Sequence, residues 1–317
     1  MKILITADWH IRGDRPRCRI DENWLETQRQ DIRAVREVAR KHRVDAVWIL
    51  GDLFHQPRCA TEAVNMTLSA LGELREVCPV RILAGNHDLP YHDFKNLDAC
   101  SLGIVYNAGH CPLDYRGTGS GYKYNETRTT NGEWLDVYAA PFGEDRAEEL
   151  DALKPAIWSV HVLTFPSDKD RPAKDVGVTA DELLDAAPSA RVILTGDYHH
   201  GYMVTRQDGR KVITPGCLNI QVADMADYRP RVYILDTDTL DAEPVYLEGH
   251  AGDIVTDYLV EQQERDERME KVLEVVGDGV ASLDFMGNLD REIDTGNYPK
   301  ARKMFPWLKD TLNKDRT

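Results

Sequence analysis

The chain has 317 residues, of which 42% are apolar and 29% charged, so it has room for one large domain or two unequal ones and is neither wholly disordered nor collagen-like. With 39 Lys and Arg against 54 Asp and Glu, the formal net charge is −15, which disfavours a protein that is a strongly basic nucleic-acid binder throughout. No apolar run approaches the roughly 20 residues of a membrane span, and Asp8 and His10 interrupt the apolar start, so we expect a cytoplasmic protein without a secretion signal.

The first hundred residues alternate between apolar runs typical of buried strands and segments with apolar residues at helical spacing. We expect the order strand, helix, strand, helix, strand over residues 2–7, 22–41, 44–50, 61–74 and 80–84. This alternation favours parallel strands in an α/β sheet.

The pattern changes in the middle of the chain. Residues 112–132 are polar and glycine-rich, which predicts loops and short hairpins. Beyond them we expect alternating strands and helices at 134–140, 146–153, 156–160, 179–187 and 191–194.

Antiparallel pairing is expected after residue 203. Asp208-Gly209 predicts a two-residue hairpin turn, and closing strands are expected at 231–235 and 244–247. An acidic segment with helical spacing follows at 256–276. We therefore place a domain boundary near residue 248, with 1–248 as the main domain and 249–317 as a C-terminal capping or partner-binding region.

Polar residues with metal-binding side chains follow the expected strands, and ligands gather at the carboxyl ends of strands in such sheets. The strings are Asp8-Trp9-His10, Gly51-Asp52, Gly85-Asn86-His87-Asp88, His161 and Gly196-Asp197-Tyr198-His199-His200. Each string alone is a weak signal, because a strand-end Asp is usually a cap or turn residue and a lone His usually belongs to the core. The ordered set favours a metal site.

Carboxylate, imidazole and amide donors together suit divalent ions such as Mn²⁺, Fe²⁺ or Zn²⁺. The strings offer more ligands than one ion needs. Two ions about 3.5–4 Å apart that share a carboxylate would use them all, and such a pair stabilises both the attacking and the leaving oxygen of a phosphoester.

The order of these strings resembles that of the calcineurin-like metallophosphoesterases. Within this family the chain is similar to the SbcD-type DNA repair and recombination nucleases of bacteria and phages, over about residues 1–245. The matching segments are Thr6-Ala7-Asp8-Trp9-His10, Gly51-Asp52-Leu53-Phe54-His55, Leu83-Ala84-Gly85-Asn86-His87-Asp88 and, more weakly, Ala140-Pro141-Phe142 and Pro215-Gly216-Cys217-Leu218.

The resemblance implies a fold, a cofactor and an activity. The fold is an α/β, four-layer αββα sandwich, here with a small C-terminal helical or capping region. The cofactor is a pair of divalent ions, foremost Mn²⁺, with Mg²⁺, Fe²⁺ or Zn²⁺ as alternatives. The activity is hydrolysis of DNA phosphodiesters by an exonuclease, with endonuclease activity also open.

The resemblance also assigns metal ligands. Asp8, His10 and His199 hold the first metal, Asn86 and His161 hold the second, and Asp52 bridges both. Asp197 stands where the family usually has a histidine. We expect Asp197 to be a ligand. The alternatives are that His200 takes its place or that the second metal binds weakly; otherwise we expect His200 to contact the substrate or to support the ligands.

Three further residues have implied roles in catalysis. His87 is not a ligand in the family: it faces the scissile phosphate, stabilises developing charge and protonates the leaving oxygen, with Asp88 orienting its ring. His55 matches a family histidine beside the substrate path, although a plain surface-loop role is an equal alternative.

Arginines follow two of the motifs, and we expect them to contact DNA phosphates: Arg12, Arg15, Arg17, Arg19 and Arg58. The alternative is a solvated loop in which nearby acidic residues balance the charge.

The sequence thus favours a metal-dependent DNA nuclease. A phosphodiesterase or phosphatase for a small phosphoester and a catalytically weak scaffold that binds DNA or a partner are the alternatives. Two apolar stripes on the helix at 61–74 predict a homodimer, with burial of both stripes inside one chain as the alternative. Apolar residues at 298–312 predict docking of an SbcC-like ATPase subunit, with a cap on the core as the alternative.

Overall fold

The computed structural model describes residues 1–109, 122–128, 134–143, 156–173, 176–248 and 254–255. The chain divides into two compact units, Met1–Thr256 and Asp257–Thr317, and the second unit lies outside the described residues. The helices expected at 146–153 and 256–276 and the roles expected of 249–317 also fall outside them, save for residues 254–255. No helix among the described residues combines the length and the apolar character that crossing a bilayer requires.

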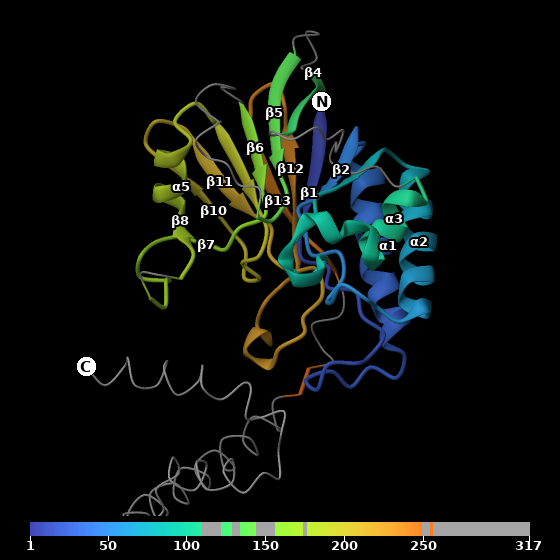
Figure 1. Cartoon of the computed structure of the whole chain (residues 1–317). Coiled ribbons are helices and arrows are strands. Elements are labelled where there is room, and N and C mark those ends of the chain that lie inside the picture. The colour runs from blue at the N-terminus through green and yellow to red at the C-terminus, as the bar shows by residue number, and fades with distance from the viewer. Residues whose placement is uncertain (110–121, 129–133, 144–155, 174–175, 249–253, 256–317) are drawn as a thin grey trace, which may run out of the picture. The chain divides into compact units, whose positions relative to one another are not determined.

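Two sheets form the centre of the first unit (Figure 1). The first sheet has the strand order β13–β12–β1–β2–β3, with bounds Ala242–Tyr246, Arg231–Asp236, Lys2–Thr6, Ala46–Ile49 and Val80–Ile82. The strands β1, β2 and β3 pair in parallel, which confirms the expectation from the strand–helix alternation. Strand β12 runs antiparallel to both β1 and β13.

The second sheet has the order β10–β11–β9–β6–β5–β4. Its strands span Tyr202–Thr205, Lys211–Thr214, Val192–Thr195, Ile157–Val160, Trp134–Ala140 and Tyr122–Arg128. The strands β11, β9, β6 and β5 are parallel, whereas the edge pairs β10–β11 and β4–β5 are antiparallel. A separate short pair joins β7 (Thr164–Phe165) to β8 (Val178–Thr179).

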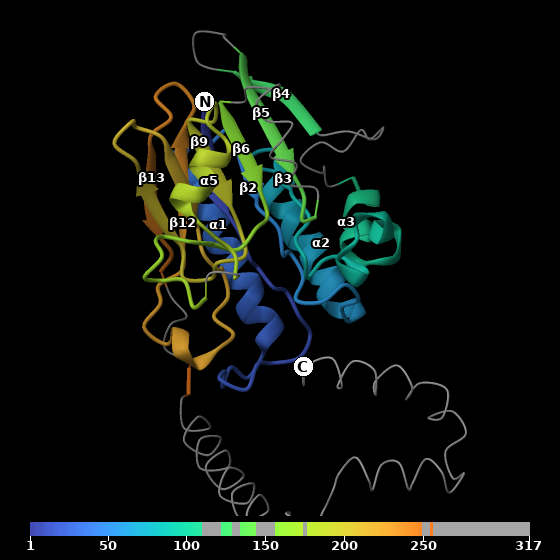
Figure 2. The ribbon, with the colours of Figure 1, turned by 60° about the vertical axis from the view of Figure 1, so that its left-hand side comes forward.

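Helices cover the outer faces of both sheets, as Figures 1 and 2 show. The α-helices are α1 (Trp24–His42), α2 (Thr61–Arg75), α3 (Ser101–Asn107) and α5 (Ala180–Ala186), and short 3₁₀ turns span Pro90–His92, Phe94–Ala99 and Ala223–Met225. Helices α1, α2 and α3 lie beside the first sheet and α5 lies beside the second.

Alternating strand residues build the four layers, because successive side chains of a strand point to opposite faces. On the first sheet Leu4 and Ile49 pack with the helices, whereas Ile5 and Trp48 belong to the core shared with the second sheet. Trp158 of β6 faces outward onto the core around α5. The arrangement is helices, sheet, sheet, helix, so the expected αββα sandwich is confirmed.

The structure differs from the expectations at two places. Residues 122–128, expected in loops and short hairpins, form strand β4, which pairs with β5 along most of its length. Asp208 and Gly209 lie in a loop between Thr205 and Lys211 rather than in a two-residue turn.

Candidate metal centre

The loops after β1, β2 and β3 meet the loops after β6 and β9, which brings all the sequence motifs to one end of the two sheets. Backbone hydrogen bonds hold the first two loops together: the Asp8 N–H donates to the Gly51 carbonyl at 3.1 Å, and the His10 N–H donates to the Asp52 carbonyl at 2.9 Å. Asp8, His10, Asp52 and Asp197 all have positive φ, between 45° and 77°. Such strained backbone at side chains with metal-binding groups is typical of a functional site.

Two motif glycines are required because the site is so compact. Gly51 has φ of 102°, and a Cβ there would lie 2.1 Å from His161 Nδ1. A Cβ at Gly85 would lie 2.1 Å from Asp52 Oδ1. Only glycine lets these loops approach the neighbouring side chains so closely.

A first group of candidate ligands consists of Asp8, His10 and His199, whose donor atoms lie within 4.8 Å of one another. The Nε2 atoms of His10 and His199 are 2.9 Å apart. Two imidazole nitrogens this close need a proton or a cation between them. Burial lowers the pKa of both histidines and so favours their neutral forms, in which one ring can donate its N–H to the other or both can bind a cation.

A second group consists of Asp8, Asp52 and His161. The His161 ring is oriented by its Nδ1 atom, which lies 2.7 Å from the Leu50 carbonyl oxygen. Its Nε2 atom then faces Asn86 Oδ1 at 2.9 Å and Asp52 Oδ2 at 3.5 Å. A histidine held through one nitrogen by a backbone carbonyl, with the other facing carboxylate and amide oxygens, is a common arrangement of metal ligands.

Asp52 lies between the two groups. Its Oδ1 atom accepts the His87 N–H at 2.9 Å, whereas its buried Oδ2 atom has no hydrogen-bond partner among the residues that the structure describes. That oxygen is 3.6 Å from His10 Nε2 and 3.5 Å from His161 Nε2. A fully buried carboxylate oxygen without a donor is costly unless a cation lies against it. The residues present therefore fit a pair of divalent ions bridged by Asp52.

The charges of the site support this interpretation. Burial is the main cause that raises the pKa of Asp8 well above its usual range, with the Asp52 charge adding to it. Burial also opposes ionisation of Asp52, but the charges of His161 and His10 outweigh it and lower the Asp52 pKa. Burial opposes protonation of His161, but the charges of Asp52 and Asp8 outweigh it and raise the His161 pKa to about 10. Divalent cations would balance the buried carboxylates more fully.

Asp197 reaches the site through its backbone. Its N–H donates to both carboxylate oxygens of Asp8, at 3.0 and 3.1 Å. Its half-exposed carboxylate is near enough that its charge favours protonation of His161 and His199. It is not among the side chains that form the two compact groups of the described residues, so its role as a ligand stays a prediction.

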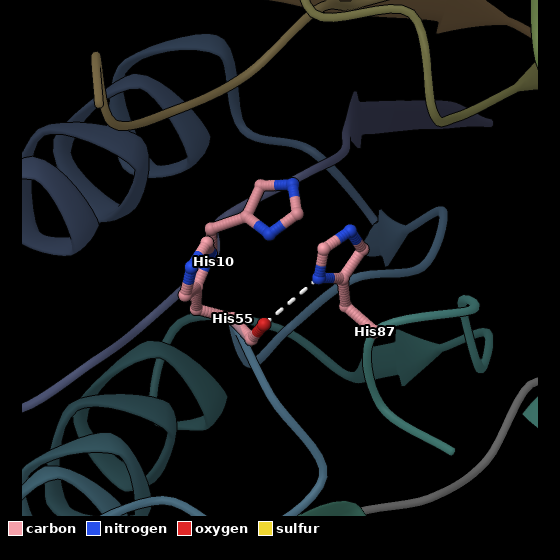
Figure 3. A group of neighbouring side chains, drawn as sticks. All are labelled: His10, His55 and His87. Atoms are coloured by element: carbon pink, nitrogen blue, oxygen red, sulfur yellow. Dashed lines mark hydrogen bonds between the residues drawn. The ribbon is translucent and has the colours of Figure 1, made fainter. Parts of the chain in front are cut away.

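A third group of three histidines, His10, His55 and His87, borders the first two groups (Figure 3). The His55 and His87 rings stack at 5.5 Å with an angle of 27°, and the His10 ring meets the His87 ring edge-on at 4.8 Å. His87 Nδ1 lies 2.8 Å from the His55 carbonyl oxygen, so His87 Nε2 is left for other partners. Burial, with the charges of Arg12 and His87, lowers the pKa of His55 to about 4, so its ring is neutral at pH 7.

Comparison with known families identifies this site. Residues 1–201 match the family described as calcineurin-like phosphoesterase. The chain belongs to that family. Its members hydrolyse phosphoesters with a dinuclear metal centre, and the two ligand groups bridged by Asp52 are the residues of this phosphoesterase that fit such a centre.

Two solved structures show some similarity to this phosphoesterase. One is a dimetal phosphatase from Danio rerio, with 13% identity, a TM-score of 0.48 and coverage of 78% of this chain and 99% of that one. The other is a conserved uncharacterized protein from Streptococcus pneumoniae, described as a predicted phosphoesterase, with 13% identity, a TM-score of 0.33 and coverage of 80% and 95%. Neither likeness bears on the substrate.

The role expected of Asp88 in this phosphoesterase needs correction. Its carboxylate, expected to orient the His87 ring, instead accepts the backbone N–H groups of Leu53, Phe54 and Gly85 at 2.9–3.2 Å. Among the described residues, the His87 ring forms its hydrogen bond with the His55 carbonyl. Burial and the Asp52 charge raise the pKa of Asp88 to about 7. Asp88 therefore ties together the loops that hold Asp52 and Asn86.

The arginines expected to contact DNA do not all face solvent. Arg19 is buried, forms a bidentate pair with Asp21 at 2.7 and 2.8 Å and lies over the Trp24 ring, so the expectation that it contacts phosphate is wrong. Arg15 donates to the Asp21 carbonyl at 2.8 Å.

The other side chains expected to contact DNA phosphates have fewer contacts within the protein than Arg19 does. Arg12 pairs with Asp14, and its guanidinium also faces Gln221 at 3.5 Å. Arg17, Arg58 and His200 are exposed, although Arg58 also donates to the backbone. Their role in DNA binding stays a prediction.

Sequence reasoning missed residues that hold the first motif in place. Asn219 donates to the Trp9 carbonyl at 2.6 Å, Gln221 donates to the His10 carbonyl at 2.7 Å, and the Leu218 N–H donates to the Asp8 carbonyl at 3.2 Å. The sequence signal that could have identified them is their position at the end of the weakly matching segment 215–218, for Leu218, or just after it, for Asn219 and Gln221.

Proposed function

We propose that this metallophosphoesterase is an SbcD-type nuclease that hydrolyses phosphodiester bonds of DNA in repair, recombination or degradation. The observation that carries the proposal is the pair His55 and His87. It lies outside the two groups that fit the metals, with the His87 ring 4.8 Å from the His10 ring. The string that contains His55 is one of those in which the sequence resembles the SbcD-type enzymes.

The residues that would hold the ions are Asp8, His10, Asp52, Asn86, His161, Asp197 and His199, with Asp52 as the bridge. A bound pair of divalent ions supplies Lewis-acid activation of water and of the phosphoryl oxygens. We propose Mn²⁺ as the working metal, because imidazole and carboxylate donors together suit it. Buried imidazoles with lowered pKa, as at His10, are neutral and ready to bind.

His87 would act on the leaving group. Its backbone N–H is fixed by Asp52 and its Nδ1 atom by the His55 carbonyl, so its ring orientation is set before substrate arrives. From there Nε2 of the doubly protonated ring can donate its proton to the leaving oxygen, which leaves a neutral ring with its hydrogen on Nδ1, and the ring can stabilise charge that develops on the phosphoryl group. His55, neutral and stacked on His87, would contact the substrate strand beside it.

The decisive test is a nuclease assay on linear and circular DNA after dialysis against EDTA, with Mn²⁺ or Mg²⁺ then restored. We expect cleavage only with metal, and cleavage of linear DNA at least as fast as of circles. Bis(p-nitrophenyl) phosphate serves as a small-substrate reference in the same buffers. Metal-dependent turnover of the small ester with none of DNA would favour the small-phosphoester alternative, and full DNA cleavage in EDTA would rule out the metal mechanism.

The partners remain proposals. We propose that an SbcC-like ATPase binds residues in 249–317, and that the protein works in the cytoplasm, in the host if a phage encodes it. A homodimer through α2 also stays a proposal. Val64, Leu71, Ala70 and Leu74 of its two stripes lie in the core of the chain itself, whereas Met66 and Leu68 are only partly buried.

A further inference from the structure

A continuous series of rings and guanidinium groups leads away from the metal centre. It starts at Tyr198, between the candidate ligands Asp197 and His199. The Tyr198 ring lies 5.7 Å from the His200 ring, and His200 lies 6.3 Å from Tyr228. We call the series Tyr198, His200, Tyr228, Arg231, Tyr246 and Arg229 the aromatic track.

Arginines continue the series to the edge of the first sheet. The Arg231 guanidinium lies 5.8 Å from the Tyr228 ring and 5.8 Å from the Tyr246 ring, and the Arg229 guanidinium lies 4.9 Å from the Tyr246 ring. Every link of the track is thus between 4.9 and 6.3 Å, from a loop of the metal centre to the end of β13.

Hydrogen bonds to the backbone fix the inner members of the track, and its members Tyr246 and His200 are exposed to solvent. Arg231 donates to the carbonyl oxygens of His200 and Gly201 at 2.5 and 2.7 Å, and the hydroxyl of the half-buried Tyr228 donates to the Cys217 carbonyl at 3.2 Å. Tyr246 is 44% exposed, and the His200 side chain is exposed as well. Packing explains the inner members but not an exposed tyrosine with two arginines against its ring.

A groove lined by three cations and two carboxylates, with Arg40 and Glu37 paired, adjoins the outer end of the track. It has a volume of about 670 Å³ and runs between the last turns of α1 and the end of β13. Tyr246 lines it together with Arg40, Lys41 and Arg43, while Glu37 and Glu248 also contribute to its wall. In a chain of net charge −15, a local concentration of cations around an exposed ring fits a polyanion with flat apolar groups.

From these observations we propose that the aromatic track binds a single strand of nucleic acid and guides it to or from the metal centre. Bases would stack on His200 and Tyr246, and Arg229 and the cations of the groove would face the phosphates. Rings interleaved with cations are what single-strand recognition uses, because every base has a face that stacks. This inference rests on the proposed function, since it assigns the strand that the nuclease centre would cut.

The test is fluorescence anisotropy of a labelled oligothymidylate titrated with the full-length protein in EDTA, at one fixed salt concentration. We expect Tyr246→Ala to weaken binding about 10-fold, because one stacked base is lost, whereas Tyr246→Phe keeps the ring and retains most of the affinity. Arg229→Ala should weaken binding and lower its dependence on salt.

Matched controls come from the helical face. Ile104→Ala removes an exposed apolar side chain of α3, and Arg33→Ala removes an exposed arginine of α1, so neither should change binding. Thermal unfolding of each variant checks that it is folded.

The outcomes separate this inference from the proposed function. Binding by Tyr246→Ala equal to the wild type, or a loss that affects duplex DNA and not the single strand, would overturn the track as a single-strand site. Hydrolysis of bis(p-nitrophenyl) phosphate by the wild-type protein with Mn²⁺ reports on the metal centre alone. If that hydrolysis is absent while the single strand still binds through Tyr246, the proposed catalytic function fails and the track stands.

Discussion

At the scale of single residues, His87 is the motif histidine to which we assign a role in catalysis and not in metal binding. Its backbone amide contacts Asp52 and its ring is held by a backbone carbonyl, so neither contact depends on a metal. Among the ligand groups of the described residues, His87 occurs only with His10 and His55 and not with a carboxylate.

We therefore predict that His87→Gln lowers the rate of DNA cleavage about 10² to 10³-fold, because a charge-stabilising donor is lost from the transition state. Metal content, measured by elemental analysis after gel filtration, should stay at the wild-type level. His42→Gln, on the last turn of α1, is the control. A loss of bound metal in the His87 variant would make His87 a ligand instead.

Asp197 gives a second prediction at this scale. Since its backbone N–H already contacts Asp8, only its carboxylate is in question. We expect Asp197→Ala to weaken binding of one of the two Mn²⁺ ions and Asp197→His to restore it, as measured by calorimetric titration. Asp208→Ala, in an exposed loop of the second sheet, should leave the titration unchanged. Unaltered stoichiometry in Asp197→Ala would mean that the carboxylate is not a ligand.

Asp88 gives a prediction about stability. The fully buried Asp88 carboxylate accepts three backbone N–H groups. In Asp88→Asn, the side-chain NH₂ group, itself a donor, would face at least one of these N–H groups and leave it without an acceptor. We expect the free energy of unfolding in urea to fall by about 1–3 kcal/mol, the cost of one unsatisfied buried polar group. The exposed Asp98→Asn should change it little. An equally stable Asp88 variant would show that the loops do not depend on these bonds.

At the scale of elements, the segment that leads into α1 is fixed by a buried ion pair. Burial of Asp21 raises its pKa, but the hydrogen bonds and charge of Arg19 and the hydroxyl of Thr27 outweigh it, so the pKa is lowered overall. A carboxyl with a lowered folded-state pKa stabilises the fold above its ordinary pKa of about 4, and this contribution disappears as the pH falls through the folded value.

Asp21→Asn should therefore reduce stability at pH 7 and make it less dependent on pH below about 4 than in the wild type. Thermal unfolding between neutral and acid pH measures both effects. The exposed Asp93→Asn, whose side chain caps only a short 3₁₀ turn, is the comparison. If the stability of the wild type and of Asp21→Asn falls equally with pH below about 4, the Arg19–Asp21 pair does not contribute to the acid dependence of stability.

Helices that depend on contacts within a few residues were predicted correctly from the sequence, whereas strands that depend on pairing with a distant strand were not always predicted. The helix expected at 179–187 is present as α5, because Thr179 and Glu182 form a capping box within one turn. Strand β4 was not expected, since a polar segment such as Tyr122–Arg128 becomes a strand only through its pairing with β5. The helix expected at 61–74 is present as α2, and most apolar residues of its two stripes are buried in the chain's own core, while Met66 and Leu68 are partly buried.

At the scale of the whole molecule, the tail carries the remaining prediction. Residues 298–312 contain apolar side chains that suit docking on a partner, and they lie outside the described residues. Deletion of residues 297–317 should leave Mn²⁺-dependent cleavage by the isolated protein largely unchanged, while co-purification with an SbcC-like ATPase and stimulation by ATP are lost. A truncated protein that unfolds, or that loses basal cleavage, would assign the tail to the core or to a cap instead.

The sequence by itself determined the fold class, the identity of the candidate ligands and their common location. This was possible because the carboxyl ends of parallel strands must meet at one edge, so residues that follow Ile5, Ile49 and Ile82 gather there wherever the helices pack. The motif glycines were likewise fixed locally, by a positive φ or a close contact.

Only the tertiary structure decided how the side chains are used. Arg19 lies in a charged segment that the sequence suggests is exposed to solvent. It is buried because it forms an ion pair with Asp21 and packs over the Trp24 ring. Asp88 is one residue from His87 but contacts loops that are 34 and 35 residues away. The aromatic track joins residues from three separate segments. Sequence patterns report which groups are present and on which face of an element they lie, whereas distances between groups from different elements depend on how those elements pack.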